Sequence, residues 1–224
     1  MDWQPLWLTF KLASITSVLL LFFAIPVAYW LAFGKFKGRG IVEALIGMPL
    51  VLPPSVIGFY LLLAFSPSYI FGSWIEANLG FRLVFSFPGL VIASLIYSFP
   101  FMVYPIRAGL QSIPHSLHEA SYTLGKSKTE TFFKVLLPNI KPALLTAFVL
   151  TFAHTVGEFG VVLMIGGNIP GVTKVASVAI YNEVEALNYG VANQYALILF
   201  ASTFAILLIV YSINNRLLRV RQGA

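Results

Sequence analysis

Five long apolar stretches, separated by loops, constrain this chain more than any other feature of its sequence. A helix needs about 20 mostly apolar residues to cross roughly 30 Å of hydrocarbon. The stretches cover residues 12–33, 41–65, 87–106, 143–165 and 195–213. Apolar residues make up 58% of the chain and charged residues only 10%, which is too apolar for a soluble fold of this size. The sequence predicts an all-α integral membrane protein with about five transmembrane helices.

The lysines and arginines predict how these helices are oriented, because cytoplasmic loops carry the excess of both. If the N-terminus is outside, the inner segments are residues 34–40, 107–141 and the chain after 213. These segments hold most of the 14 basic residues, namely Lys35, Lys37, Arg39, Arg107, Lys126, Lys128, Lys134, Lys141, Arg216, Arg219 and Arg221. The predicted topology is therefore N-out and C-in, with a basic cytoplasmic tail over residues 214–224. The net charge of +6 reflects this topology and does not indicate a nucleic-acid surface.

Prolines interrupt the second apolar stretch. Pro49, Pro53 and Pro54 lie within six residues, and each proline inside a helix costs about 3 kcal/mol or more. Broken backbone at membrane depth is tolerated where protein buries it or where it lines a watery cavity. Pro53, Pro54 and Ser55 are therefore candidates for a translocation path or gate. A packing kink between neighbouring helices would explain the same residues equally well.

The inner loop between the third and fourth stretches carries a helix–turn–helix pattern. Leu117, Ala120 and Leu124 recur at helical spacing and predict a short helix with one apolar face. Gly125 fits the C-terminal end of that helix, where a positive φ is needed. A second short helix is predicted over residues 129–137. Such an element beneath the membrane is suited to docking a soluble partner.

The same loop resembles the signature of a known family. The pattern Glu-Ala-Ala, three residues, Gly, nine residues and Ile-x-Leu-Pro is typical of the permease subunits of binding-protein-dependent ABC importers. The matching residues here are Glu119, Ala120, Ser121, Gly125, Val135, Leu137 and Pro138. Ser121 replaces an alanine and Val135 an isoleucine, so the two departures keep small and β-branched side chains. The resemblance implies a type I ABC transmembrane domain over residues 7–213, with residues 107–141 as the cytoplasmic coupling loop.

The family resemblance also implies what the individual loop residues do. Ala120 and Ser121 are expected to let an ATPase subunit approach closely. Glu119 is expected either to pair with a basic group or to lie in the N-terminal turn of the helix, where the helix dipole favours a carboxylate.

The loop also contains a sequence that looks like the end of a phosphate-binding loop, Gly125-Lys126-Ser127. The full pattern needs a glycine five residues earlier, where Ala120 stands, so no nucleotide site is expected. The two histidines of this loop have no third ligand, and no metal site is expected. The chain is predicted to bind no cofactor and to be no enzyme by itself. A His-Glu pair in the fourth stretch does not match a metalloprotease pattern.

The resemblance implies several partners for this chain. ATP and Mg²⁺ would be bound by two copies of a separate ATPase subunit, and the permease itself would be a homodimer. A periplasmic or lipid-anchored binding protein would deliver the substrate. The expected location is the inner membrane of a bacterium or archaeon.

Three further segments resemble the molybdate branch of the family. They cover residues 48–60, 157–160 and 167–181, and sulfate permeases share the first two in looser form. Molybdate is the expected substrate, and tungstate cannot be separated from it because the two anions have nearly the same size and charge. A sulfate or thiosulfate permease is the alternative. A secondary transporter working without an ATPase would usually show coupling-ion residues or a repeat, and neither is clear here.

Polar residues in the fourth apolar stretch are further candidates for the path. Thr151, His154 and Glu158 lie near one another on a helix, and an ionisable residue inside the membrane is a functional candidate by default. Because an anion path should not present a free carboxylate, Glu158 is predicted to brace neighbouring helices in a hydrogen-bonded or protonated form. His154 is either a packed, hydrogen-bonded side chain or part of the path. Gly157 and Gly160 are also candidates for the path, and they would allow close approach of helices in a dimer or bundle seam.

Overall fold

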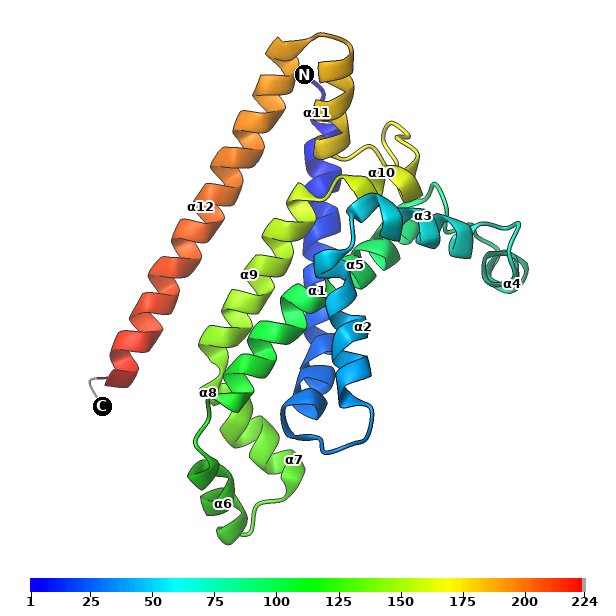
Figure 1. Ribbon diagram of the computed structural model, residues 1–224. Coiled ribbons are helices and arrows are strands. Elements are labelled where there is room, and N and C mark those ends of the chain that lie inside the picture. The colour runs from blue at the N-terminus through cyan, green and yellow to red at the C-terminus, as the bar shows by residue number, and fades with distance from the viewer. Residues whose placement is uncertain (223–224) are drawn as a thin grey trace.

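The computed structural model describes the backbone of residues 1–222 and the side chains of residues 1–212, and within that part the chain is helical without a β-strand. Figure 1 shows a tall bundle with a sideways arm at one end. The helices are α1 (Gln4–Phe33), α2 (Arg39–Val51), α3 (Pro54–Phe65), α4 (Ile70–Leu79), α5 (Phe87–Gln111), α6 (His115–Thr123), α7 (Lys128–Thr131), the π-helical turn η1 (Phe132–Leu136), α8 (Leu137–Asn139), α9 (Lys141–Gly157), α10 (Gly160–Gly166), α11 (Ala176–Glu185) and α12 (Tyr189–Gln222).

Three helices, α1, α5 and α9, pack against one another and form the centre of the bundle. Helix α2 lies along α5, and α12 lies beside α9 and α11. Helix α3 packs on α10 and leads into α4, which forms the outer end of the arm in Figure 1. The loop between α1 and α2, the α6 helix and the C-terminal end of α12 lie at one end of the bundle, opposite the N-terminus. This arrangement brings the three predicted inner segments to the same side.

Helices α1, α5 and α12 are long and apolar enough to cross a membrane, and up to five spans result if each of two bent helix pairs is counted as one. The predicted all-α fold with several membrane spans is confirmed. The first bent pair is α2 and α3, which meet at 112°. Pro53 stands at this bend as the N-cap of α3, so the second predicted span is broken where its prolines indicate.

The fourth predicted span, residues 143–165, is wrong as a single helix. Helix α9 ends at Gly157, and α10 starts at Gly160 after a break at Glu158 and Phe159. Glycine weakens a helix by about 1 kcal/mol relative to alanine, and here two glycines flank the break. The second bent pair instead joins residues 128–139 to α9 at 71°.

Among the described residues, the apolar core forms three clusters, and the smallest joins α1, α11 and α12 around Leu6 and Tyr195. The first cluster includes Leu12, Leu90 and Ile165 and joins α1, α5 and α10 with α3. The second cluster includes Leu31 and Ile106, and it takes in Leu136, Ile140 and Ala147 from η1, the turn before α9, and α9. The coupling loop is therefore anchored in the core through its second half.

Polar contacts join neighbouring helices at both ends of the bundle. Glu43 on α2 pairs with the Arg39 guanidinium at 2.8 Å and with Arg107 of α5 at 3.0 Å. On the opposite side, the backbone N–H of Ala176 donates to the Thr9 hydroxyl at 2.8 Å, which ties α11 to α1. The basic side chains of the predicted 214–224 tail lie outside the described residues.

Candidate functional site

The sequence motif of the inner loop folds into a hairpin of two helical arms, which we call the coupling hairpin (residues 115–139). Its first arm is α6, and its second arm is α7, η1 and α8 in direct succession. Gly125 follows α6 with φ of +76°, so the predicted left-handed residue at the helix end is confirmed. The N–H of Lys126 donates to the Ser121 carbonyl at 3.1 Å, which closes the C-terminal turn of α6.

The predicted apolar face of α6 points away from the rest of the chain. Leu117 and Ala120 are exposed, and Leu124 at the C-terminal end is 79% exposed. A single exposed leucine needs no explanation, but three apolar residues on one side of a short helix are typical of a docking surface. Leu117 is 37% exposed and so partly covered by the chain, whereas Leu124 is open.

The expectation for Ser121 is wrong, and so is one of the two alternatives for Glu119, the N-terminal turn; the other, a contact with a basic group, fits His115. Ser121 does not lie on the accessible face but is 5% exposed, and its Oγ lies 2.8 Å from Oγ1 of Thr131 on α7. Glu119 is not in the first turn of α6, because the helix already begins at His115. The Glu119 carboxylate instead lies 3.3 Å from Nδ1 of His115, one turn earlier, and is largely exposed.

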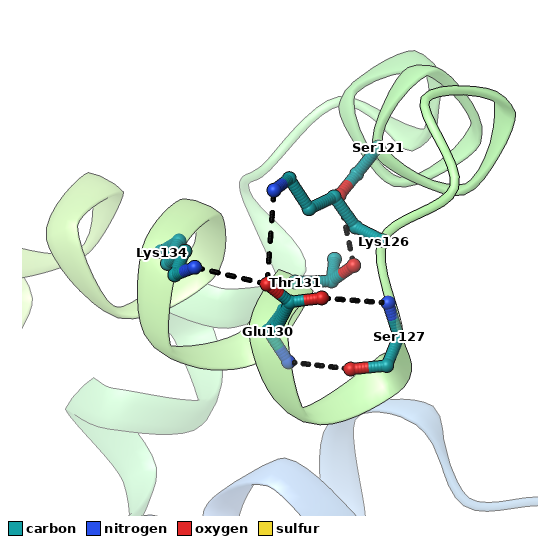
Figure 2. Close-up of polar contacts among 6 residues, drawn as sticks. All are labelled: Ser121, Lys126, Ser127, Glu130, Thr131 and Lys134. Atoms are coloured by element: carbon teal, nitrogen blue, oxygen red, sulfur yellow. Dashed lines mark hydrogen bonds and ion pairs between the residues drawn. The ribbon is translucent and has the colours of Figure 1, made fainter.

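The turn between the two arms is held by a capping box. The Ser127 hydroxyl accepts from the Glu130 N–H at 3.2 Å, and the Glu130 carboxylate accepts from the Ser127 N–H at 3.4 Å. The same carboxylate lies 2.9 Å from Nζ of Lys134 and 3.7 Å from Nζ of Lys126 (Figure 2). The hydrogen bond from Lys134, the N–H of Ser127 and the charge of Lys126 lower the pKa of Glu130 from 4.5 to about 2.

This pKa shift predicts how the hairpin responds to acid. A lowered pKa stabilises the folded turn above pH 4.5, and that contribution disappears as the pH falls toward 2. We expect pepsin to cut the hairpin of Glu130→Gln faster than that of the wild type near pH 5. The ratio of the two cleavage rates should approach one near pH 2. A ratio that does not change over this range would contradict the assigned role of the carboxylate.

The second arm carries the remaining motif residues. Within η1, the N–H of Leu137 donates to the Phe132 carbonyl, five residues earlier. The wider turn lies next to Pro138, which has no N–H and would clash with the carbonyl four residues before it in a regular α-helix. The second predicted helix is therefore divided into three pieces. Val135 and Leu137 are half-buried, whereas Pro138 is exposed.

A second candidate site is a cavity of about 610 Å³ at the break between α9 and α10. The predicted path residues that line it are Pro54, Ser55, His154, Gly157, Glu158 and Gly160. Pro53 caps the start of α3 and does not line the cavity, and Thr151 is buried with its hydroxyl donating to the Ala147 carbonyl. Tyr97, Ala153 and Phe159 complete the lining.

Glu158 joins three elements at this cavity. Its side chain is 4% exposed, and its Oε2 accepts from the Ser94 hydroxyl of α5 at 2.9 Å. Its backbone carbonyl accepts from the Ser177 hydroxyl of α11 at 2.6 Å. Its Oε1 is buried and has no hydrogen-bond partner among the described residues. The hydrogen-bonded position between helices agrees with the predicted brace.

His154 is held by rings and by one hydroxyl. Its ring stacks on Phe101 with centroids 3.9 Å apart and lies 4.9 Å from the ring of Tyr97. Its Nδ1 lies 3.0 Å from Oγ of Ser98, which also lies 3.0 Å from Oγ1 of Thr155. The side chain is thus packed and hydrogen-bonded while it also lines the cavity.

The two glycines at the break serve different purposes. A Cβ atom at Gly160 would come within 2.8 Å of Cβ of Pro54, so α10 and the start of α3 are in close contact there. Nothing lies within 4 Å of the corresponding position at Gly157. The seam predicted for both glycines therefore exists at Gly160 and joins helices of one chain.

Polar residues of α5 also belong to this site, and the sequence did not predict them. Ser94 and Ser98 are fully buried and contact Glu158 and His154, and Tyr97 lies between them. Their spacing was the available signal, because two serines four residues apart inside an apolar helix share one face.

Comparisons with known proteins show the family to which this chain belongs. The family described as "Binding-protein-dependent transport system inner membrane component" matches residues 24–219. The molybdenum transport system permease protein ModB of Azotobacter vinelandii is 44% identical over 212 residues, which is 94% of this chain and 93% of that protein. A probable sulfate transport system permease protein, cysT of Chlorella vulgaris, is 36% identical over 203 residues, covering 90% of this chain and 76% of the relative.

A solved structure has the same fold. The bacterial alginate ABC transporter in complex with an alginate pentasaccharide-bound periplasmic protein has a chain that matches with a TM-score of 0.76. The two chains are 18% identical, and the match covers 96% of this chain and 78% of the other. The chain described here belongs to the family of binding-protein-dependent transport system inner membrane components and is the permease component of an ABC importer.

Proposed function

We propose that this permease moves molybdate across the inner membrane, driven by ATP that a separate ATPase subunit hydrolyses. The substrate is proposed from the relative that is 44% identical over nearly the full length of both chains. Tungstate would be carried by the same path, since its size and charge are nearly those of molybdate. A sulfate permease remains the competing substrate assignment because a sulfate relative is 36% identical.

The geometry of the coupling hairpin is the main support for an ATP-driven mechanism. Its first arm presents Leu117, Ala120 and Leu124 outward, and its second arm inserts Leu136 into the core cluster of α1, α5 and α9. A partner that grips the first arm would therefore move the second arm and the base of α9. The partner in this proposal is the ATPase subunit, which binds ATP and Mg²⁺ while this chain holds no cofactor.

The cavity at the break between α9 and α10 is the proposed part of the anion path. The N-terminus of α3 reaches it through Pro54 and Ser55, and the start of a broken helix favours an anion. Because no cation pairs with the Glu158 side chain among the described residues, we propose that this carboxyl group is neutral and braces the break. In the proposed assembly, two copies of the permease face each other, two ATPase subunits bind the hairpins, and a periplasmic or lipid-anchored binding protein docks outside.

Uptake of labelled molybdate into proteoliposomes tests the proposed function. The vesicles carry this permease together with its ATPase subunit. ATP is supplied on the side of the membrane where the ATPase is bound, and the binding protein with molybdate on the opposite side. We expect ATP-dependent uptake that excess tungstate abolishes and excess sulfate leaves nearly unchanged. Competition by sulfate would assign the chain to sulfate transport instead. Uptake that continues without the ATPase subunit would indicate a secondary transporter.

A further inference from the structure

The first arm of the coupling hairpin is attached to the protein by few apolar contacts. Ser121 is the one residue of α6 that is buried, although the opposite arm buries Thr131 and Leu136. Helix α6 also touches α1 through the ring of His118, whose centroid lies 4.8 Å from that of Phe33. Because α6 has so few apolar contacts, it needs a specific contact with α7 if the two helices are to move together.

A buried pair of hydroxyl groups provides such a contact. Oγ of Ser121 and Oγ1 of Thr131 lie 2.8 Å apart, and the two residues are 5% and 1% exposed. Figure 2 shows this pair beside the capping box of Ser127 and Glu130, so the turn and the hydroxyl pair close the hairpin at adjacent points. Because both hydroxyls are shielded from water, each depends on the other for its hydrogen bond.

Ser121 connects the exposed arm of the hairpin to the arm that is anchored in the core. In the family pattern this position is an alanine, and the hairpin of this chain has a serine there that points at the other arm and away from the docking face. The next turn after Thr131 is η1, which leads directly to the buried Leu136. A displacement of α6 can therefore pass through Thr131 into the core only while the hydroxyl pair holds the arms together.

We propose that Ser121 and Thr131 are positioning residues that make α6 and α7 move as one rigid body during ATP-driven transport. This proposal rests on the proposed function of the hairpin as the ATPase contact. Breaking the pair would let α6 follow the ATPase without moving α9. ATP would then be hydrolysed with fewer anions imported per ATP.

Four variants of the full transport complex test the proposal. Ser121→Ala and Thr131→Val each leave one buried hydroxyl without its partner, and the double variant replaces both partners by apolar groups of similar shape. Thr129→Val is the matched control, because Thr129 is an exposed threonine on the same helix. For each complex in proteoliposomes, the anions imported per ATP are measured. Hydrogen exchange of the α6 amides is measured on the same permease.

We expect each single variant to speed exchange of the α6 amides by roughly fivefold or more and to lower the number of anions imported per ATP. The double variant should be no more impaired than either single variant, because both substitutions break the same contact. Wild-type values in both single variants, or a double variant impaired by the sum of the two, would overturn the proposal. If the wild-type complex imports no molybdate, the proposed function fails, while the exchange data still decide whether the pair joins the two arms.

Discussion

Replacing Gly125 by valine is expected to reduce ATP-driven uptake roughly five- to thirtyfold while the membrane helices stay folded. Gly125 has φ of +76°, and a left-handed conformation costs a residue with a side chain about 1–2 kcal/mol. Nothing lies within 4 Å of a Cβ atom at this position, so the effect comes from backbone strain and not from a collision. Opening the turn would detach α6 from the second arm. Uptake and ATP hydrolysis measured on the same proteoliposomes should show that hydrolysis continues while uptake falls.

Two controls separate this effect from general damage. Gly125→Asn keeps a residue that tolerates the left-handed region and should retain most of the uptake. Gly80→Val introduces comparable strain, with φ of +71° and no neighbour within 4 Å, at the other end of the protein after α4. It should leave the number of anions imported per ATP unchanged. Equal uptake by Gly125→Val and wild type would contradict the role of the hairpin.

The second large effect is expected at Glu158, where the two substitutions should differ. Glu158→Ala removes the acceptor of the buried Ser94 hydroxyl, which costs about 1–3 kcal/mol. It also leaves a space where α5, α9 and α11 meet. We expect this variant to melt at a lower temperature and to lose most of its uptake. Glu158→Gln keeps the shape and the acceptor oxygen, so it should transport molybdate nearly as well as wild type.

Melting temperature and uptake of both variants decide between a neutral brace and a charged group. If Glu158→Gln loses uptake as completely as Glu158→Ala while melting like wild type, the carboxyl group must lose or carry a proton during transport. That outcome would contradict the proposed brace. Glu183→Ala is a suitable control, because this carboxylate is only partly buried and accepts from Asn188 in the loop after α11, away from the cavity.

The fold was largely predictable because lipid imposes strong rules on composition. Apolar stretches of sufficient length must be helical in a bilayer. The adjacent prolines Pro53 and Pro54 interrupt the second stretch, although single prolines such as Pro26 and Pro100 lie inside continuous helices. The left-handed Gly125 was predictable for a similar reason, since a helix end followed by glycine has a fixed local geometry. These features depend on few residues that are close together in the sequence.

The details of the two sites depend on contacts between distant residues. Gly157 and Gly160 look alike in the sequence, but only Gly160 meets Pro54, which is more than a hundred positions away. Ser121 lies next to the apolar face of α6 on the helix surface, so periodicity does not tell whether it points outward or toward Thr131. The π-helical turn depends both on Pro138 and on the burial of Leu136, and the second of these is invisible in a local pattern.

The separation of the two largest apolar clusters has a consequence for how such a chain can evolve. Leu136 and Ile140 lie in the cluster that anchors the coupling hairpin, which we propose as the ATPase contact. Leu90 and Ile165 lie in the other cluster, on the side of the cavity proposed for the anion path. A substitution in one cluster has few direct neighbours in the other. Substitutions around the cavity could therefore change the transported anion while the proposed ATPase contact is kept. Related permeases could then differ in substrate and still bind the same kind of ATPase subunit.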